Sequence, residues 1–309
     1  MMGKLALLFP GQGAQYVGMG LDFPNHQALL ALAQEGTGLN ILHAITTGEG
    51  LNETLYTQLS VFLTSVLALE VVESLKPKYE ALTGFSLGEY SGLFASGVLS
   101  LEDAIRLIHQ RSTFMQAETL KSQGFMAAVL GLSASEVDAG LAKVTSGQVV
   151  CANYNSPIQT VISGEEVAFV EAEQILKGLG AKRVIKLSVS GAFHSPLMKE
   201  AGLKLSEYLK TITLQSPKVP VYLNTTAQPL TIETLKAEMT LQVYSSVRFQ
   251  PTIEHMVKAG FTHFLEIGPG QVLGPLVKKI DPTLETFSFG KYSELENLKG
   301  WLTTHGFIQ

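Results

Sequence analysis

FMAAVLGLSASEV, residues 125–137, begins the part of the sequence that decides the fold. Its first eight residues, Phe125–Leu132, form a mostly apolar run of strand length. Ser133 and Glu136 follow with the spacing of a capping box, in which the two side chains satisfy free amides at a helix start. The next apolar residues are at helical spacing: Val137, Leu141 and Val144. The stretch therefore predicts a strand followed by a helix.

The segment continues to residue 189 with the same kinds of signal. Two short strands are expected at Gln148–Ala152 and Thr160–Ser163, joined by a polar turn at Asn153–Pro157. Ser163 and Glu166 have the spacing of a second capping box. The helix after it should end at Gly180 and bury one face, comprising Ala168, Ala172, Ile175 and Leu179. A last strand, Arg183–Val189, completes the order β-α-β-β-α-β, which is ferredoxin-like.

The rest of the chain alternates short apolar runs with helical patterns, which is typical of an α/β domain with a mostly parallel sheet. The expected strands are Lys4–Phe9, Glu80–Gly84, Val219–Asn224, His263–Ile267 and Thr286–Phe289. A helix should begin at Ser100, and an amphipathic helix, Glu294–Leu302, should pack on the body. We therefore predict a large α/β domain, 1–124 and 190–309, interrupted by a small ferredoxin-like domain, 125–189.

Composition limits the class of protein. The chain has 309 residues, 46% of them hydrophobic and only 16% charged, against about 25% charged in a typical globular protein. A single cysteine excludes an internal disulfide and a cysteine-cluster zinc site. A net charge of −5 argues against non-specific binding to nucleic acid or a membrane surface. The longest apolar stretch, Val61–Val72, is too short and too interrupted to span a membrane. No targeting signal is evident, so a cytoplasmic enzyme is expected.

Gly84-Phe85-Ser86-Leu87-Gly88 matches the pattern G-x-S-x-G directly after a predicted strand. In this pattern a sharp strand-to-helix turn presents the serine hydroxyl, and the next amide can stabilise an oxyanion. The chain has 29 glycines, so two of them could flank a serine by chance. The small-residue helix pattern that follows favours the interpretation of Ser86 as a nucleophile.

A serine nucleophile needs a base, which is usually histidine. Of the seven histidines, His194 is preferred because it follows the last strand of the inserted domain. A chain returning to the main domain there lines the cleft between the two, where ligand sites are common. No carboxylate is obviously placed as the third member of a triad. Glu89 is too close to Ser86 in sequence to be assumed to reach the same histidine.

Other residues allow more than one interpretation. The turns at Gly11-Gln12-Gly13 and Gly268-Pro269-Gly270 follow predicted strands, but neither has the spacing of a nucleotide-binding loop. Arg111 lies on or near the buried edge of its helix. Its position favours a structural ion pair or a side chain that reaches the surface. A bidentate clamp for a substrate carboxylate is the functional alternative.

Taken together, several motifs resemble one family. They are FPGQGAQ (9–15), GFSLGEYSGL (84–93), QRSTFMQ (110–116), GFMAAVLG (124–131), SGAFHSPLM (190–198) and EIGPGQVL (266–273). In this order they are similar to the malonyl-CoA:acyl carrier protein transacylase family of bacterial type II fatty-acid synthesis. The resemblance covers essentially the whole chain. It implies an α/β-hydrolase-like large domain with an inserted ferredoxin-like domain, in agreement with the patterns above.

The resemblance also implies a role for particular residues. Ser86 would be the acylated nucleophile and His194 its base, with the backbone amides of Gln12 and Leu87 as the oxyanion hole. Arg111 would bind the malonyl carboxylate. A backbone carbonyl near Gln242 would orient the histidine, which explains the missing triad acid. Three further residues match positions that line the pocket: Asn155, Met115 and Met126.

Two positions beside the motifs bear on specificity. Phe85 stands where the family often has histidine, which removes a possible polar contact. Phe193 matches the residue found in malonyl-selective members of the family. A ring beside the acyl pocket would disfavour the extra methyl group of methylmalonyl. That methyl group discriminates by only about 1–3 kcal/mol.

The resemblance implies transfer of malonyl from malonyl-CoA to the phosphopantetheine thiol of acyl carrier protein through a malonyl-serine, with no metal and no cofactor of its own. The carrier is usually acidic, and candidate docking residues are Lys182, Arg183, Lys186, Lys278 and Lys279. Ordinary solvated charge explains these residues equally well. Two alternatives stay open: an acyltransferase of a polyketide assembly line, and a serine thioesterase or esterase.

Overall fold

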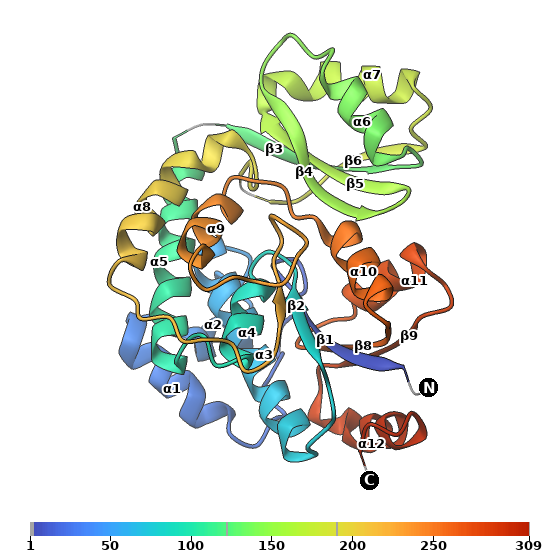
Figure 1. Ribbon diagram of the computed structural model, residues 1–309. Helices are drawn as coiled ribbons and strands as arrows, with labels where there is room; N and C mark the ends of the chain where they lie inside the picture. Colours follow the sequence, from blue (N-terminus) through green and yellow to red (C-terminus); the bar gives the residue numbers. More distant parts are fainter. Residues whose placement is uncertain (1–2, 122, 190, 309) are drawn as a thin grey trace.

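Two β-sheets organise the computed structural model, which describes residues 3–121, 123–189 and 191–308 (Figure 1). The larger sheet has five parallel strands in the order β7-β2-β1-β8-β9. Their bounds are β1 Lys4–Phe9, β2 Ala81–Gly84, β7 Val221–Tyr222, β8 Phe261–Ile267 and β9 Glu285–Phe289. All five predicted strands are confirmed. The edge strand β7 is shorter than the predicted Val219–Asn224.

Alternate side chains of the central strand β1 pack into two different cores. Leu5, Leu7 and Phe9 belong to the larger apolar cluster, whereas Ala6 and Leu8 belong to the cluster on the opposite face. This follows from the two-residue period of a strand, and it means that helices cover both faces of the sheet. These helices are α1 His26–Thr37, α2 Ile41–Thr47, α3 Thr54–Ser74, α4 Gly88–Ala95, α5 Leu101–Thr119, α8 Lys199–Leu209, α9 Leu235–Gln242, α10 Phe249–Lys258, α11 Leu273–Ile280 and α12 Leu295–Thr304.

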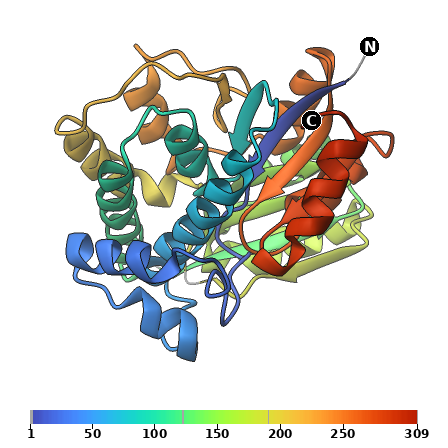
Figure 2. The same cartoon turned by 90° about the horizontal axis from the view of Figure 1, so that it is seen from below.

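Three of the large domain's helices test specific expectations. The side chain of Ser100 caps α5 by accepting a hydrogen bond from the amide of Asp103, as predicted. Helix α3 is the one helix in the described residues that is long and apolar enough to cross a membrane, but 78% of its apolar window is buried in the protein, as in a core helix. The C-terminal helix α12 buries Leu298 and Leu302 and lies along the edge of the sheet next to β9 (Figure 2).

The smaller unit has the predicted order β-α-β-β-α-β. Its elements are β3 Gly124–Leu130, α6 Ala134–Leu141, β4 Val149–Ser156, β5 Gln159–Glu165, α7 Phe169–Gly178 and β6 Arg183–Lys186. The antiparallel sheet has the ferredoxin-like order β4-β5-β3-β6, and its two helices pack together above it (Figure 1). The first capping box is confirmed, because Ser133 and Glu136 each bind the other's backbone amide.

The prediction of a turn at Asn153–Pro157 is wrong. Strand β4 continues to Ser156, because its residues pair with β5 through two irregularities of register. Asn153 also forms a bridge to Val247 of the large domain. These polar residues therefore belong to a strand that contacts the large domain. The local sequence carries no signal for that contact.

The second capping box is also wrong. Ser163 lies inside β5, paired with Met126 and Val150, and a short 3-10 helix, Glu166–Ala168, precedes α7 without a side-chain cap. The buried face of α7 includes Ala172 and Leu176, whereas Leu179 is 39% exposed. The final strand ends at Lys186 rather than at Val189.

The small unit rests on the large one through β4. The amide of Tyr154 donates to the carbonyl of Val247 over 2.9 Å, and the amide of Val247 donates to the carbonyl of Ala152 over 2.8 Å. We propose the division into domains 1–124 with 190–309 and 125–189, although Gly124 already pairs within β3 and residue 190 lies outside the described residues.

Candidate active site

The turn between β2 and α4 presents Ser86 in an uncommon backbone conformation. Its φ is +52°, in the left-handed region that L-residues rarely adopt. The flanking glycines make this possible. A Cβ on Gly84 would lie 1.9 Å from the carbonyl carbon of Gly88, and one on Gly88 would lie 1.9 Å from the carbonyl oxygen of Phe9. The G-x-S-x-G pattern is therefore required by close backbone approach, as expected for such an elbow.

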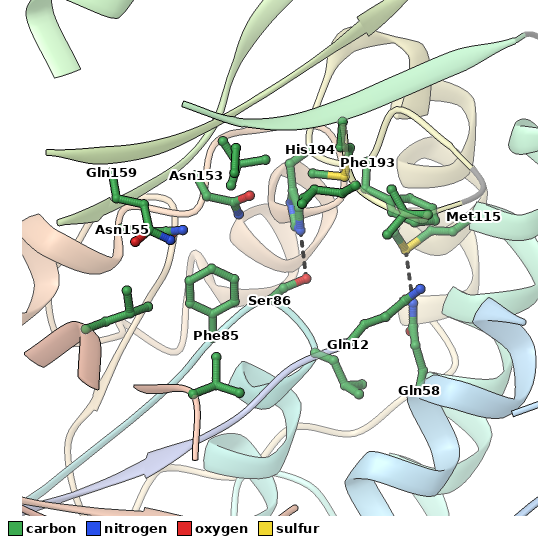
Figure 3. Close-up of a pocket in the computed structure, with 18 of the residues that line it drawn as sticks. Gln12, Gln58, Phe85, Ser86, Met115, Asn153, Asn155, Gln159, Phe193 and His194 are labelled. Atoms are coloured by element: carbon green, nitrogen blue, oxygen red, sulfur yellow. Dashed lines mark hydrogen bonds between the residues drawn. The ribbon is translucent and has the colours of Figure 1, made fainter. Parts of the chain in front are cut away.

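His194 lies beside this serine. Its Nε2 is 2.7 Å from Ser86 Oγ (Figure 3). Its Nδ1 faces two acceptors, the carbonyl oxygens of Gln242 at 2.9 Å and Ser245 at 3.2 Å. Because both are carbonyls, the ring proton resides on Nδ1, and Nε2 is left to accept the proton of the serine. The fold thus brings Ser86 and His194 together as a pair of hydroxyl and base.

The electrostatic surroundings keep this histidine neutral. Burial, together with the neighbouring Arg111 cation, lowers the pKa of His194 to about 4, although the two carbonyls that accept from its ring oppose the shift. Within the described residues no aspartate or glutamate hydrogen-bonds to the ring. A backbone carbonyl from α9 takes the place of a triad acid.

Arg111 is buried, with only 1% of its surface exposed. Its Nη1 donates to Gln58 Oε1 over 2.7 Å, and its Nη2 donates to Gln242 Oε1 over 2.9 Å and to Ser86 Oγ over 3.3 Å. Its guanidinium also lies 5.1 Å from the ring centre of Tyr90. In the part of the chain that the structure describes, no carboxylate forms a salt bridge with it.

The position of Arg111 on its helix favoured a structural ion pair or a side chain that reaches the surface, and this prediction is wrong for the described residues. The side chain neither reaches the surface nor forms an ion pair among the described residues. Its hydrogen-bond partners are neutral, and the buried Glu89 acts on it without a salt bridge in the described residues, so an anionic ligand beside this cation would be favourable. Burial lowers the pKa of Arg111 from its ordinary value, with Tyr90 and Glu89 opposing the shift.

Gln242 connects the three groups of the site. Its backbone carbonyl accepts from His194, its Oε1 accepts from Arg111, and its Nε2 donates to the carbonyl of Ser86 over 2.7 Å. It does not line the cavity itself. The structure thus places Gln242, which the resemblance implied would orient the histidine, behind the serine, where it supports all three groups.

The amides expected to form the oxyanion hole both belong to cavity-lining residues, Gln12 and Leu87. Among residues 3–121, 123–189 and 191–308, neither amide donates to a protein acceptor. Leu87 starts the first turn of α4, where backbone N–H groups point outward and favour negative charge. Both amides are thus available to a ligand oxygen.

The cavity above Ser86 has a volume of about 400 Å³ and lies between the two domains. The pocket residues predicted from sequence all line it: Met115, Met126, Asn155 and Phe193. Phe85 lines it as well and packs on Phe249, with ring centres 5.6 Å apart. Figure 3 shows Asn153, Asn155 and Gln159 of the small domain facing the turn that carries Ser86.

Sequence reasoning missed several residues of the site. Gln58 supports Arg111 from α3, and Asn153 and Gln159 add amides to the cavity wall. Asn224, beside β7, accepts a hydrogen bond from the Ser86 amide over 2.8 Å. Gln58 lies just before the apolar run Val61–Val72, and no local pattern marks its contact with Arg111. For Asn224 no local pattern marks the contact.

Of the basic residues considered for docking, Lys279 is at the cavity, where its Nζ donates to Gln159 Oε1 over 3.0 Å. Lys186 forms an ion pair with Glu166. Lys278 lies 4.0 Å from Glu285. The charge of the last two lysines is therefore partly balanced within the chain.

A parallel α/β sheet with a serine on a strand-to-helix elbow, a histidine on its hydroxyl and free amides beside it defines an enzyme class that moves acyl groups through serine. Comparison with known proteins narrows the class. The family model described as "Acyl transferase domain" matches residues 6–285. The chain is 40% identical to the malonyl CoA-acyl carrier protein transacylase of Staphylococcus aureus, over 97% of this chain and 99% of the relative. It belongs to the malonyl CoA-acyl carrier protein transacylase family.

Other relatives and solved structures agree. The transacylase of the same name from Bacillus subtilis is 39% identical, over 96% of both chains. The crystal structure of this enzyme from Clostridium perfringens has a TM-score of 0.93 at 35% identity and covers 98% of both chains. A malonyl-transacylase in complex with its type II PKS acyl-carrier protein has a TM-score of 0.91 at 34% identity, over 95% of this chain and 98% of the other.

Proposed function

We propose that this protein is an acyl-carrier-protein S-malonyltransferase, which moves the malonyl group of malonyl-CoA to the phosphopantetheine thiol of an acyl carrier protein. In the cytoplasm, this reaction would supply fatty-acid elongation. One observation carries the proposal. Ser86 Oγ lies between the neutral His194 ring, at 2.7 Å, and Arg111, at 3.3 Å, with which no carboxylate forms a salt bridge in the described residues. A nucleophile and a site for an acyl carboxylate are thus adjacent.

In the first half-reaction, Nε2 of His194 accepts the hydroxyl proton of Ser86 while Oγ attacks the thioester carbon of malonyl-CoA. The oxyanion accepts hydrogen bonds from the amides of Gln12 and Leu87, each donor contributing about 3–4 kcal/mol in comparable sites. The tetrahedral intermediate collapses to a malonyl-serine ester. The C–S bond breaks, and CoA leaves as a thiol with the proton from His194.

The second half-reaction runs the same steps in reverse with a different thiol. His194 accepts the proton of the phosphopantetheine thiol, and the thiolate attacks the ester carbon of malonyl-Ser86. The Oγ–C bond breaks, the proton returns to Ser86, and malonyl leaves on the carrier. A histidine that is neutral at pH 7 serves both steps, because each begins with proton acceptance.

Arg111 binds the free carboxylate of malonyl in this account. The planar guanidinium pairs with a carboxylate through parallel hydrogen bonds, and the pair is strong where water is excluded. Acetyl has no carboxylate, so it leaves the buried cation without an anionic ligand. The clamp therefore selects malonyl over acetyl.

The pocket walls favour an unbranched acyl group. The apolar side chains of Met115, Met126 and Phe193 line the cavity, with Asn155 on the small-domain side. An added methyl group would press on these walls, in particular on the Phe193 ring. We therefore expect malonyl to be preferred over methylmalonyl by about 1–3 kcal/mol in transition-state binding.

Hydrolysis is the rival reaction of a serine acyl enzyme. The orientation of His194 by a backbone carbonyl, and a cation placed for an acyl carboxylate, support transfer over a general esterase or thioesterase. An acyl carrier protein of a polyketide assembly line remains a second candidate acceptor. It is favoured by the structural likeness to a malonyl-transacylase that is bound to a type II PKS acyl-carrier protein.

We expect the carrier to dock at the mouth of the cavity. We expect neither nucleic acid nor a membrane as a partner. We propose that the basic residues near the small domain and α11 contribute: Lys182, Arg183, Lys186, Lys278 and Lys279. Charge reversal at the residues outside the cavity wall, Lys182, Arg183, Lys186 and Lys278, should raise the KM for the carrier and leave the KM for malonyl-CoA unchanged. An unchanged carrier KM would count against this surface.

The test is incubation of the protein with malonyl-CoA and a fatty-acid carrier that bears phosphopantetheine, with the carrier mass as readout. We expect malonylated carrier to form much faster than malonate appears in solution. A polyketide carrier in a parallel reaction compares the two acceptors. Rapid release of malonate, with the carrier unmodified, would identify a hydrolase instead.

A further inference from the structure

A buried asparagine, Asn224, holds both sides of the turn that presents Ser86. Its side-chain Oδ1 accepts a hydrogen bond from the Ser86 amide over 2.8 Å. Its Nδ2 donates to the carbonyl of Gly84, the last residue of β2, over 2.7 Å. Only 1% of Asn224 is exposed. One side chain therefore spans the elbow from the end of the strand to the serine.

The elbow needs such support because Ser86 adopts a left-handed backbone conformation, which is unfavourable for an L-residue. Its amide is outside the sheet ladder and the helix ladder, so Asn224 supplies the acceptor that secondary structure does not. The next residue, Leu87, lines the cavity, and its amide donates to no acceptor among the described residues. If the Ser86 amide lost its acceptor, the turn could rotate, and rotation would displace both the Ser86 hydroxyl and the Leu87 donor.

Asn224 is itself fixed from three directions. Its backbone amide donates to the carboxyl Oε2 of Glu89 over 2.6 Å, and its carbonyl accepts from the Arg248 amide over 3.0 Å. The Gln242 side chain adds a longer contact of 3.4 Å to Oδ1. These partners come from α4, from the start of α10 and from the end of α9. The asparagine is thus a rigid link between the elbow and the body of the large domain.

Glu89 is an acidic residue in the first turn of α4, where all of the residues are buried, which is an unusual place for a carboxyl group. It is 1% exposed, and burial raises its pKa to about 7, although the Asn224 amide and Arg111 both lower it. A buried carboxyl is retained where it satisfies a donor that would otherwise be unpaired. Here the donor is the Asn224 amide.

We propose that Asn224 is a positioning residue for acyl transfer, and that Glu89 serves by fixing Asn224. Neither residue lines the cavity, so both act through Ser86 and Leu87 and not on the substrate. This inference rests on the proposed function of the same site. It deepens that function by assigning the geometry of the nucleophile to residues outside the expected catalytic set.

The first test is Asn224→Ala, measured as steady-state malonyl transfer per folded molecule. We expect kcat to fall about 10- to 100-fold, as for small misplacements of reacting groups. KM for malonyl-CoA should change less than about threefold, because the cavity wall and Arg111 are untouched. Near-ultraviolet circular dichroism measures the folded fraction, and a fluorophosphonate reports the reactivity of Ser86 without any need for malonyl.

Thr83→Val is the matched control. Thr83 is buried in β2, and its hydroxyl donates to the carbonyl of Tyr222 over 3.0 Å, so the variant removes a hydrogen bond between the same two strands. Among the described residues, the Thr83 hydroxyl makes no hydrogen bond to the turn. We expect a lowered Tm and a kcat per folded molecule within about twofold of wild type.

Glu89 provides a second, independent pair of variants. In Glu89→Gln a side-chain carbonyl can still accept from the Asn224 amide, so most of kcat should remain. Glu89→Ala leaves this amide without an acceptor, and its kcat should fall in the manner of Asn224→Ala. If Asn224→Ala yields no folded protein, this pair decides the question with the same readouts.

Wild-type kcat per folded molecule in Asn224→Ala, or in Glu89→Ala, would overturn the inference. So would an equal loss of kcat in Thr83→Val, because the effect would then belong to the strand pair in general. Wild-type protein that transfers no malonyl contradicts the proposed function. Wild-type transfer with unaffected variants contradicts the positioning role alone.

Discussion

At the scale of single residues, the least usual feature is a buried cation, Arg111, which lies beside a nucleophile and whose hydrogen-bond partners among the described residues are all neutral. Gln58 and Gln242 hold its guanidinium, and one Nη reaches Ser86 Oγ. The amide oxygens orient the fork but do not neutralise it. We propose that this charge binds the free carboxylate of the acyl group, which would distinguish the site from that of a general serine hydrolase.

Arg111→Ala should reduce kcat/KM for malonyl-CoA at least about 30-fold, since truncating one partner of a buried charge pair costs about 2–5 kcal/mol. Acetyl transfer should fall much less, because acetyl has no carboxylate to lose. The ratio of the two rates, measured with the same carrier, separates selectivity from damage to the fold. An unchanged ratio of malonyl to acetyl transfer would show that Arg111 has another role.

The pH profile of acylation tests the state of His194. The imidazole has an ordinary pKa of 6.5, and burial and Arg111 lower this pKa to about 4 in the folded chain. The histidine stays a neutral base above that pH, so the acid limb of kcat/KM for malonyl-CoA should lie near pH 4. Arg111→Gln removes one cause of the shift, and the limb should move to higher pH. A wild-type limb at pH 6.5 is the opposing result.

The same shift affects stability. Between pH 6.5 and 4, the unfolded chain binds a proton at His194 that the folded chain does not, so the unfolding free energy falls as the pH is lowered through this window. A His194→Gln variant should show a smaller loss of stability over the window. Urea unfolding at a series of pH values measures the difference between the two proteins.

At the scale of elements, the buried carboxylate of Glu266 fixes the start of α11. It accepts from the amides of Leu273 and Gly274 over 2.9 Å and 3.0 Å, and from the Ser288 hydroxyl over 3.0 Å. Three successive amides at a helix start would otherwise be unpaired, since the Val272 amide donates to the same group. Helix α11 carries Leu276 and Lys279 into the cavity wall.

Glu266→Gln should lower the unfolding free energy by about 1–3 kcal/mol, because the new NH₂ group faces donors and leaves buried amides unsatisfied. Ser133→Ala removes the exposed cap of α6 and is the comparison, with a cost of about 1 kcal/mol. Denaturant unfolding measures both. A smaller loss for Glu266→Gln than for Ser133→Ala would contradict the role given to the buried carboxylate.

The element scale also shows what local sequence can predict. The five strands of the large sheet and the order of elements in the small domain could be predicted from the spacing of apolar residues, because that spacing depends on residues close together in sequence. The ends of β4 and β5 do not. Asn153 and Ser163 are polar and suggested a turn and a cap, yet cross-strand pairing and the contact with Val247 keep both in strands.

At the scale of the whole molecule, the site depends on contacts across the chain. Ser86 meets His194 from 108 residues away and Asn224 from 138 residues away. The motif around Ser86 and the resemblance indicated the first contact. The second, like that of Gln58 with Arg111, has no local signal, because an isolated amide residue in a sequence says nothing about the partner that folding brings to it.

Ligand binding should therefore stabilise both domains together. Ser86→Ala keeps the cavity but cannot be acylated in this account, so malonyl-CoA should bind it without turnover. At about 100 times Kd, the ligand should add about 2.7 kcal/mol to the unfolding free energy. We expect one thermal transition that moves to higher temperature. A shift confined to one of two separate transitions would show that the cavity does not join the domains.

The most direct test of the central claim is a peptide map of the protein after brief reaction with malonyl-CoA. We predict one malonyl group per chain, on the peptide that contains Ser86, absent from Ser86→Ala and passed to the carrier thiol when carrier is added. Malonyl found on another residue, or retained by Ser86→Ala, would contradict the account.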